Sequence, residues 1–359
     1  MGSDRVIVIA EAGVNHNGDP ELALRLVDAA AEAGADYVKF QTFKAAALVT
    51  RTAPKAAYQD RNAPETRTQY EMLKALELKP ETHGLLMQRC RERGIKFLST
   101  GFDTESVALL ADVLKLPLIK VSSGDLTNAP LLLQLARSQA DLILSTGMAT
   151  LEEIEIALSV VAFGYLKSGM PSLDACRALL ATAEAREVLK RKITLLHCTS
   201  DYPAQPTDVN LLAMDTLKTR FGVPVGYSDH TVGTLVSVLA VAHGACMIEK
   251  HMTLDRGMEG PDHRASLEPA EMKAMVEQIR FAELTLGSPE KNPTAAELPT
   301  RMVARKRIVA ARSIPTGEPF STDNLTTKRT VDGLEPMLFW QLIGQPARRD
   351  YQADDAIEL

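Results

Sequence analysis

The feature that most constrains the fold of this chain is a repeated alternation of short apolar runs with longer helix-like segments. Eight runs rich in β-branched residues occur at 6–13, 36–42, 95–102, 118–124, 142–147, 194–200, 224–230 and 246–252. The segments between them, such as PELALRLVDAAAEAG at 20–34, carry apolar residues at helical spacing and end at glycine. Strands that alternate with helices form parallel sheets. Eight such units within about 280 residues predict a closed (β/α)8 TIM barrel.

An open, doubly wound sheet is the alternative, but the first strand is not followed by a GxGxxG turn. The placement of polar residues also favours the barrel, because they gather at the C-terminal ends of nearly all the strands. They are Glu11, Lys39, Gln41, Thr100, Lys120, Ser123, Ser145, His197, Ser200, Asp229, His230, Glu249 and His251. In a barrel these ends converge on one rim, which is where barrel enzymes keep their active sites. Exposure of a strand end to water could explain a polar residue at one strand, but it would not explain polar residues at the C-terminal ends of nearly all of them.

The last fifth of the chain differs in character from the barrel region. Residues 1–284 are the predicted catalytic barrel, and the stretch 285–300, rich in proline and without a clear period, is a predicted linker. Residues 301–359 contain β-rich runs with turn signals at 315–317 and 323–324. This segment is about the size of the smallest independent domains. We expect a small β-rich domain there.

Composition excludes several classes of protein. With 45% hydrophobic and 24% charged residues the chain is globular, and a net charge of −6 argues against a nucleic-acid-binding protein. The four cysteines lie far apart without a CxxC pair, so neither a zinc knuckle nor a disulfide framework is indicated. We find no signal peptide and no apolar run long enough to span a membrane, and therefore predict a cytoplasmic protein.

Two histidines are candidates for a metal site. His230 and His251 close the seventh and eighth strands, so their imidazoles should be neighbours in a barrel. Such a pair suits a divalent transition ion such as Mn²⁺, Fe²⁺ or Zn²⁺, with water and substrate completing the coordination. Alternatively, both are core histidines that serve only as hydrogen-bonding groups. Without other evidence, two histidines at these positions slightly favour that interpretation. His16 and His197 are further candidates for the rim.

Two lysines interrupt otherwise apolar strands, at VKFQ and IKVS. Lys39 and Lys120 would be costly to bury unless each meets an anion. They could pair with Glu11 or Glu249, act as a Schiff-base nucleophile, or bind an anionic substrate. The anion site would be completed by backbone N–H groups and by the hydroxyls of Thr100, Ser123 and Ser145.

Three acids are available for proton transfer or for holding sugar hydroxyls. Glu249 directly follows an apolar run, and Glu11 ends the first strand, whereas Asp262 could equally be a solvated loop carboxylate. Lys250 lies between Glu249 and His251 and points to the other face of the strand by alternation, so we expect no catalytic role for it.

The motifs resemble, in order, those of bacterial sialic acid synthases, which are phosphoenolpyruvate-dependent enzymes that make nine-carbon nonulosonic acids. The matching segments are EAGVNHNGD, DYVKFQTFKA, LSTGFD, IKVSSGDLTN, LSTGMAT, LHCTSDYPA, GYSDHTVG and IEKHMTLDRGMEGPDHRASLEP. The tail IVAARSIPTGEPFSTDNLTTKR resembles their C-terminal antifreeze-protein-like (SAF) domain. The resemblance covers almost all of the chain, although STGF and KRTVDG stand where STPF and KRPGNG are common.

The resemblance implies a TIM barrel with a small antifreeze-protein-like domain, which reaches over the partner's active site in a domain-swapped homodimer. It implies that His230 and His251 bind a catalytic divalent metal, most often Mn²⁺, with Mg²⁺ or Co²⁺ as alternatives. It gives phosphoenolpyruvate or sugar contacts to Lys39, Gln41, Thr100, Lys120, Ser123, Ser145, Ser200 and Tyr202, and to Arg329 across the dimer. It assigns sugar orientation and proton transfer to Glu11, Glu249 and Asp262.

The chemistry expected from this resemblance is attack of C3 of phosphoenolpyruvate on the aldehyde of an open-chain N-acylated mannosamine. The tetrahedral intermediate formed with water then loses phosphate by C–O cleavage. The segment PDHRASLEP fits synthases of N-acetylneuraminate, which we favour, and of legionaminate, and differs from what we expect of the pseudaminate branch. A Schiff-base pyruvate aldolase and a non-catalytic sugar-binding barrel are the alternatives from other classes.

Overall fold

The structure is a computed structural model that describes residues 5–62 and 65–358. It consists of two compact units, Met1–Gly287 and Ser288–Leu359. Within the described ranges no helix is both long enough and apolar enough to cross a membrane.

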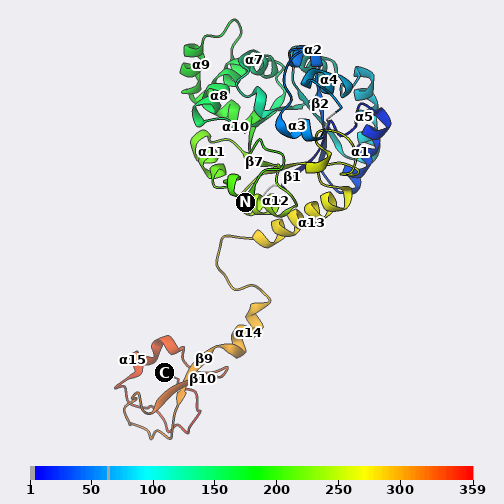
Figure 1. The fold of residues 1–359 in the computed structure, drawn as a ribbon. Helices are drawn as coiled ribbons and strands as arrows, with labels where there is room; N and C mark the ends of the chain where they lie inside the picture. Colours follow the sequence, from blue (N-terminus) through cyan, green and yellow to red (C-terminus); the bar gives the residue numbers. More distant parts are fainter. Residues whose placement is uncertain (1–4, 63–64, 359) are drawn as a thin grey trace. The chain divides into compact units, whose positions relative to one another are not determined.

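The first unit is a closed barrel of eight parallel strands in sequential order (Figure 1). The predicted TIM barrel is therefore confirmed. The strands are β1 (Ile7–Gly13), β2 (Tyr37–Thr42), β3 (Lys96–Gly101), β4 (Leu118–Val121), β5 (Asp141–Ser145), β6 (Ile193–Cys198), β7 (Val225–Asp229) and β8 (Met247–His251).

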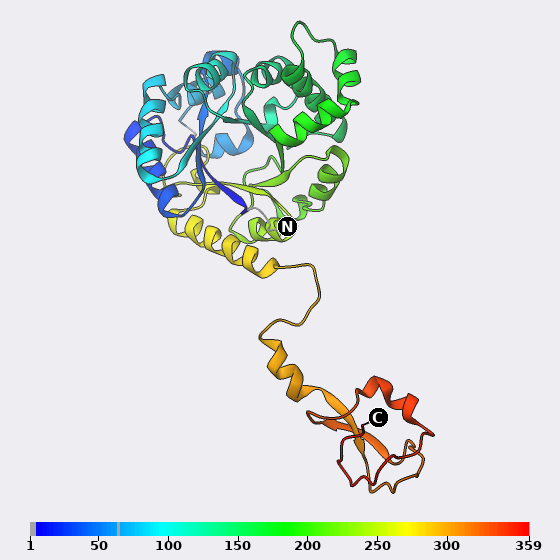
Figure 2. The ribbon, with the colours of Figure 1, turned by 180° about the vertical axis from the view of Figure 1, so that it is seen from behind.

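The helices of this unit mostly surround the strands on the outside of the barrel, as Figures 1 and 2 show from opposite sides, whereas α3 (Ala57–Asn62) lies across the barrel opening. They are α1 (Pro20–Glu32), α2 (Ala45–Leu48), α3 (Ala57–Asn62), α4 (Gln69–Ala75), α5 (Pro80–Arg93), α6 (Thr104–Ala108), α7 (Ala129–Arg137), α8 (Leu151–Leu166), α9 (Leu173–Leu180), α10 (Ala183–Lys192), α11 (Ala213–Phe221), α12 (Leu235–Ala242) and α13 (Pro269–Leu286). A π-helical turn, Leu109–Val113, follows α6.

Helix α1 shows how local sequence sets these boundaries. The Asp19 side chain accepts a hydrogen bond from the Glu21 N–H, and Pro20 occupies the first helical position, where its missing N–H costs nothing. Gly34 follows the helix with φ of 81°, a left-handed conformation that glycine adopts without strain. The face toward the barrel buries Leu22, Ala23, Leu26, Val27 and Ala30.

The barrel interior changes from apolar to polar along each strand. Its floor is an apolar cluster separate from the main core, formed by Ile9, Leu98, Ile143, Leu196 and Met247. Because side chains two residues apart share a strand face, the next inward position after Ile9 is Glu11, after Leu98 is Thr100 and after Met247 is Glu249. An apolar floor therefore lies beneath a polar rim at the C-terminal strand ends.

The second unit holds a two-stranded antiparallel sheet, β9 (Lys306–Ala310) with β10 (Leu325–Arg329). Its own core contains Ile308, Ala310, Ile314, Phe320, Leu325, Leu342, Ala347, Tyr351 and Ile357. The unit also contains helices α14 (Glu297–Ala304) and α15 (Phe339–Leu342). This arrangement agrees with the predicted small β-rich domain.

The predicted boundaries of the linker at 284 and 300 fall inside helices α13 and α14. The prolines had suggested irregular structure up to residue 300. However, Pro299 lies in the first turn of α14, where backbone N–H groups have no helical partner and proline is tolerated.

Gly226 in β7 is required by a close approach between strands. A Cβ at this position would lie 2.4 Å from the Met247 carbonyl oxygen and 2.7 Å from Leu196 Cδ2. We predict that Gly226→Ala lowers the free energy of unfolding by about 1–3 kcal/mol through overpacking. Urea denaturation measures this change.

Gly84→Ala is the matched control, because Gly84 lies within α5 and a Cβ there has no heavy atom within 4 Å. It should raise the free energy of unfolding by about 0.5–1 kcal/mol, since glycine is unfavourable inside helices. Equal responses of the two variants would contradict the packing argument.

Candidate active site

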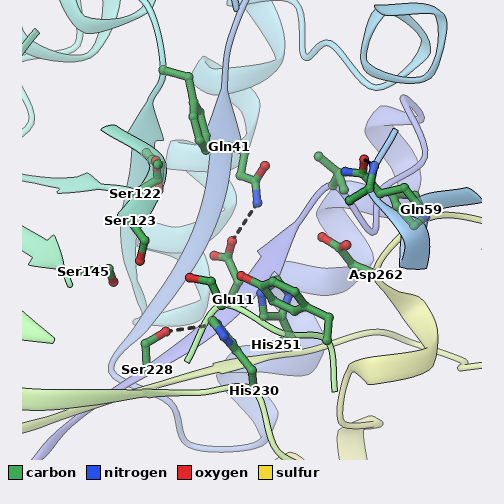
Figure 3. Close-up of a pocket in the computed structure, with 18 of the residues that line it drawn as sticks. Glu11, Gln41, Gln59, Ser122, Ser123, Ser145, Ser228, His230, His251 and Asp262 are labelled. Atoms are coloured by element: carbon green, nitrogen blue, oxygen red, sulfur yellow. Dashed lines mark hydrogen bonds between the residues drawn. The ribbon is translucent and has the colours of Figure 1, made fainter. Parts of the chain in front are cut away.

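The polar rim encloses a pocket of about 520 Å³ at the C-terminal ends of the strands (Figure 3). Every residue of the barrel unit to which the family resemblance gives a role in the site lines this pocket. These residues are Glu11, Lys39, Gln41, Thr100, Lys120, Ser123, Ser145, Ser200, Tyr202, His230, Glu249, His251 and Asp262. Side chains from all eight strands or from the loops that follow them thus converge on one cavity, as the barrel topology requires.

A network of four buried charges forms the floor of the pocket. Lys39 Nζ lies 2.6 Å from Glu11 Oε2 and 3.8 Å from Glu249 Oε2, and Lys120 Nζ lies 3.1 Å from Glu249 Oε1. All four side chains are at most 5% exposed. The ion pairs predicted as one alternative for the two lysines are therefore present, and Lys39 also donates to Thr100 Oγ1 at 3.0 Å.

The network distributes protonation unequally between its two carboxyl groups. Burial raises the pKa of Glu11, and the nearby Lys39 only partly opposes this shift. Burial acts in the same direction on Glu249, but Lys120 and Lys39 together lower its pKa to about 2. The pKa of Lys39 is raised, because attraction to Glu11 and Glu249 outweighs the desolvation that burial causes. Glu249 is accordingly the firmly ionised acid, whereas Glu11 takes up a proton more readily.

His230 and His251 lie side by side beyond this network, with ring centroids 5.7 Å apart. Burial lowers the pKa of His230 to about 4, with a further contribution from His251. Burial and then Lys39 lower the pKa of His251 to about 3, so both rings are neutral near pH 7. Neutral imidazoles are the form that binds metal ions.

The hydrogen bonds of these rings fit a metal site. His230 Nδ1 lies 2.6 Å from the Thr199 carbonyl oxygen, so this nitrogen carries the proton and Nε2 keeps its lone pair. His251 Nδ1 is buried and has no hydrogen-bond partner among the described residues. In the same ranges no group of three or more His, Cys, Asp or Glu side chains is arranged to hold a metal ion. The two imidazoles are therefore the candidate protein ligands. The Tyr202 ring packs against the His230 ring, with the two ring centroids 4.2 Å apart.

The opposite wall of the pocket is suited to an anion. Ser123 lies in a single 3₁₀ turn after β4, and its Oγ accepts from the Gly147 N–H at 3.0 Å and lies 3.2 Å from Cys198 Sγ. The Ser145 hydroxyl is buried without a hydrogen-bond partner in the described chain. Hydroxyl groups near the buried ammonium of Lys120 supply donors to a phosphate or carboxylate.

The third wall comes from a segment that the barrel pattern did not predict. Residues between β2 and α5 fold into α2, α3 and α4, which bring Gln59, Gln69, Met72, Leu73 and Leu76 to the pocket. Met72 and Leu76 pack with Val14 and Phe43, and Phe102 adds to this cluster. This wall is mainly apolar with amide groups, unlike the charged floor.

Asp262 lies on the loop after β8, on the same side of the pocket. Burial raises its pKa to about 7, and the nearby Glu11 adds to the shift while Lys39 opposes it. The Pro261 carbonyl accepts from Asn62 Nδ2 at 2.8 Å, which ties this loop to the end of α3. Asp262 is therefore not the solvated surface carboxylate that the sequence left as an alternative.

Two rim candidates do not face the pocket. His197 Nε2 lies 2.6 Å from the Val209 carbonyl oxygen, because strand alternation turns this residue toward the outer layer of the barrel. His16 is fully buried, and its Nδ1 accepts from the Gly18 N–H at 3.0 Å within the loop after β1. Arg329 ends β10 in the second unit.

Sequence reasoning missed Ser228, although its signal was present. Ser228 lies two residues before His230 and thus on the same strand face. Its hydroxyl donates to Glu249 Oε1 at 2.9 Å. The residues of α3 and α4 gave no comparable signal, because neither strand alternation nor helical period relates them to the rim.

Comparisons with known proteins identify relatives of the whole chain. A profile of the NeuB family matches residues 26–291. The chain is 48% identical to the N,N'-diacetyllegionaminic acid synthase of Legionella pneumophila, over 94% of this chain and 89% of that protein. It is 44% identical to the enzyme of the same name from Campylobacter jejuni, over 98% and 99% of the two chains.

Among solved structures, the N-acetylneuraminic acid (sialic acid) synthetase of Leptospira borgpetersenii serovar Hardjo-bovis, in complex with citrate, is similar. It is 33% identical with a TM-score of 0.67, and the match covers 83% of this chain and 90% of that one.

The raised pKa of Asp262 makes stability depend on pH. Because the folded-state pKa lies above the ordinary value of 3.8, the protonated carboxyl group favours the folded state, and this contribution is lost as the pH rises through about 7. We predict that Asp262→Asn, which cannot ionise, becomes more stable relative to the wild type between pH 5 and pH 8. Thermal unfolding at both pH values measures the difference, and a difference that does not change with pH would refute the assignment.

Proposed function

Since this chain belongs to the NeuB family and is a carbon–carbon bond-forming transferase, we propose that it condenses phosphoenolpyruvate with an N-acylated amino sugar and water. The products are a nonulosonic acid and phosphate. One observation carries the proposal: two buried lysines and a pair of neutral imidazoles line the same pocket. The two lysines suit a small dianion, and the two imidazoles suit a metal ion next to it.

Lys39 and Lys120 bind phosphoenolpyruvate, whose phosphate and carboxylate need two separate cations. Ser123, Ser145 and Thr100 are the hydroxyl groups within the same part of the pocket. Fixed positive charges in a water-poor site stabilise the phosphate charge through the reaction without reorganising. In this structure the same ammonium groups are paired with Glu11 and Glu249.

His230 and His251 would hold a divalent metal ion, with Mn²⁺ as the expected ion and Mg²⁺ or Co²⁺ as alternatives. When bound, such an ion supplies Lewis-acid polarisation of the sugar aldehyde. This assignment is supported by the neutral rings, by the Thr199 carbonyl behind His230, and by His251 Nδ1, which has no hydrogen-bond partner within residues 5–62 and 65–358.

The carboxyl groups divide the remaining work. C3 of phosphoenolpyruvate attacks the aldehyde carbon, and positive charge develops at C2. Glu249, which stays ionised, stabilises that charge, whereas Glu11, with its raised pKa, accepts the proton of the water that adds to C2. Asp262 meets a sugar hydroxyl on the side of the pocket where α3 and α4 form the wall.

The aldolase alternative is disfavoured by the same charges. A Schiff base needs a neutral amine, but the pKa of Lys39 is raised and Lys120 lies 3.1 Å from an ionised carboxylate.

The sugar that fits best is a 2,4-diacetamido-2,4,6-trideoxymannose, which gives a legionaminate. This choice departs from the preference for N-acetylneuraminate drawn from sequence motifs. It is supported by the two relatives named N,N'-diacetyllegionaminic acid synthase and by the apolar wall of Met72, Leu73 and Leu76. A 6-deoxy sugar presents a methyl group to such a wall where N-acetylmannosamine presents a hydroxymethyl group.

The resemblance of the second unit to an antifreeze-protein-like domain remains a prediction. So do the domain-swapped homodimer, the role of Arg329 across it, and a cytoplasmic location.

The sugar assignment predicts a difference in turnover. With Mn²⁺ and phosphoenolpyruvate present, kcat/KM for the diacetamido sugar should exceed that for N-acetylmannosamine by about tenfold or more, the scale of discrimination by one apolar contact. Phosphate release measures both rates. A preference for N-acetylmannosamine would overturn the choice of sugar, and no phosphate from either would overturn the enzyme class.

The mechanism predicts which bond of phosphoenolpyruvate breaks. Phosphoenolpyruvate labelled with ¹⁸O at the bridging oxygen should yield labelled phosphate, since the intermediate loses phosphate by C–O cleavage. Mass spectrometry of phosphate and sugar acid locates the label, and retention in the sugar acid would rule out this route.

A further inference from the structure

Lys250 lies between two pocket residues, yet it is one of the largest fully buried side chains of the protein, with 1% exposure. Its Nζ is 3.0 Å from Asp229 Oδ2, and Asp229 is likewise 1% exposed. The two residues are direct register partners of β8 and β7. A buried charge without a partner is costly, so each residue needs the other in place.

The ion pair also fixes the chain beyond β7. Lys250 Nζ donates to the Thr231 carbonyl at 2.5 Å. Asp229 Oδ1 accepts from the Thr231 N–H at 2.9 Å and from its hydroxyl at 2.7 Å, and Asp229 Oδ2 accepts from Ser237 Oγ at 2.6 Å. Thr231 is thus held through its backbone donor, its backbone acceptor and its side chain.

This network lies directly behind the two imidazoles. Asp229 and Lys250 each precede one of the histidines by one residue, so their side chains occupy the opposite strand face. His230 is enclosed between Asp229 and Thr231, both of which the network holds. Continuation of the β7–β8 register places His251 next to it.

We propose that Lys250, through Asp229 and Thr231, is a positioning residue that sets the relative placement of the His230 and His251 rings. This inference rests on the proposed metal site for its consequence, because two ligands give strong binding only at a fixed separation. Groups behind metal ligands typically change metal affinity by about 10–100-fold when removed.

The test uses Lys250→Met, which keeps the length of the side chain without the charge, and the milder Thr231→Val, which removes only the hydroxyl donor. Titration with Mn²⁺, followed by the electron paramagnetic resonance signal of free Mn²⁺, should show dissociation constants raised about tenfold or more in both variants. Thr231→Ser, which keeps the hydroxyl, should bind within about twofold of the wild type.

Arg280→Met is the control for a general loss of stability. Arg280 Nη2 pairs with Asp36 Oδ2 at 2.8 Å, just before β2 and at the end of the barrel away from the pocket. This variant should bind Mn²⁺ as the wild type does. Equal weakening in Arg280→Met, or unchanged binding in Lys250→Met and Thr231→Val, would overturn the proposal.

Ring ¹H–¹⁵N spectra of the metal-free protein give a second readout that needs no metal. Lys250→Met and Thr231→Val should shift the ring signals of His230 and His251 and leave those of His83, which is bonded to Thr42 elsewhere in the barrel, unchanged. If the wild type takes up no Mn²⁺, the metal assignment fails, while these spectra still decide the positioning role. Unshifted His230 and His251 signals would refute it.

Discussion

The buried network of Lys39, Glu11, Glu249 and Lys120 is the interaction on which the rest of the site depends. Four charges are removed from water at the centre of the barrel rim, and each would be prohibitive alone. They are tolerated because they alternate in sign within hydrogen-bonding distance, at 2.6 Å and 3.1 Å for the shortest pairs. Removing one member would leave an unmatched buried charge, so the network constrains all four strands that carry it, β1, β2, β4 and β8.

The same network explains how neighbouring groups acquire different protonation. Glu249 lies between two lysines and its pKa falls, whereas Glu11 meets one lysine and its pKa rises. The pKa of Asp262 is raised to about 7, because burial and the nearby Glu11 outweigh the opposing effect of Lys39. The three acids are chemically alike, and their environments alone assign them different behaviour.

Much of this arrangement could be predicted from the sequence. Strand alternation and the barrel topology place Glu11, Lys39, Lys120 and Glu249 on one rim, because each follows an apolar strand at an inward position. The same reasoning erred for His197, where the parity of the strand turns the ring outward. It could not reach Gln59 or Met72, because they belong to short helices whose path depends on packing against Val14 and Phe43. The sequence also predicted no role for Lys250. The cost of breaking the Lys250–Asp229 ion pair depends on how deeply the pair is buried, and the structure is needed to show that burial.

The wall built by α2, α3 and α4 differs in origin from the charged floor, since it comes from one continuous insertion between β2 and α5 rather than from the strand ends. None of the four network charges belongs to it. Substitutions confined to this insertion can therefore reshape one wall of the pocket while the charges at the strand ends stay in place. The shape of the pocket and its charge are thus encoded in separate parts of the chain, so one can change without the other.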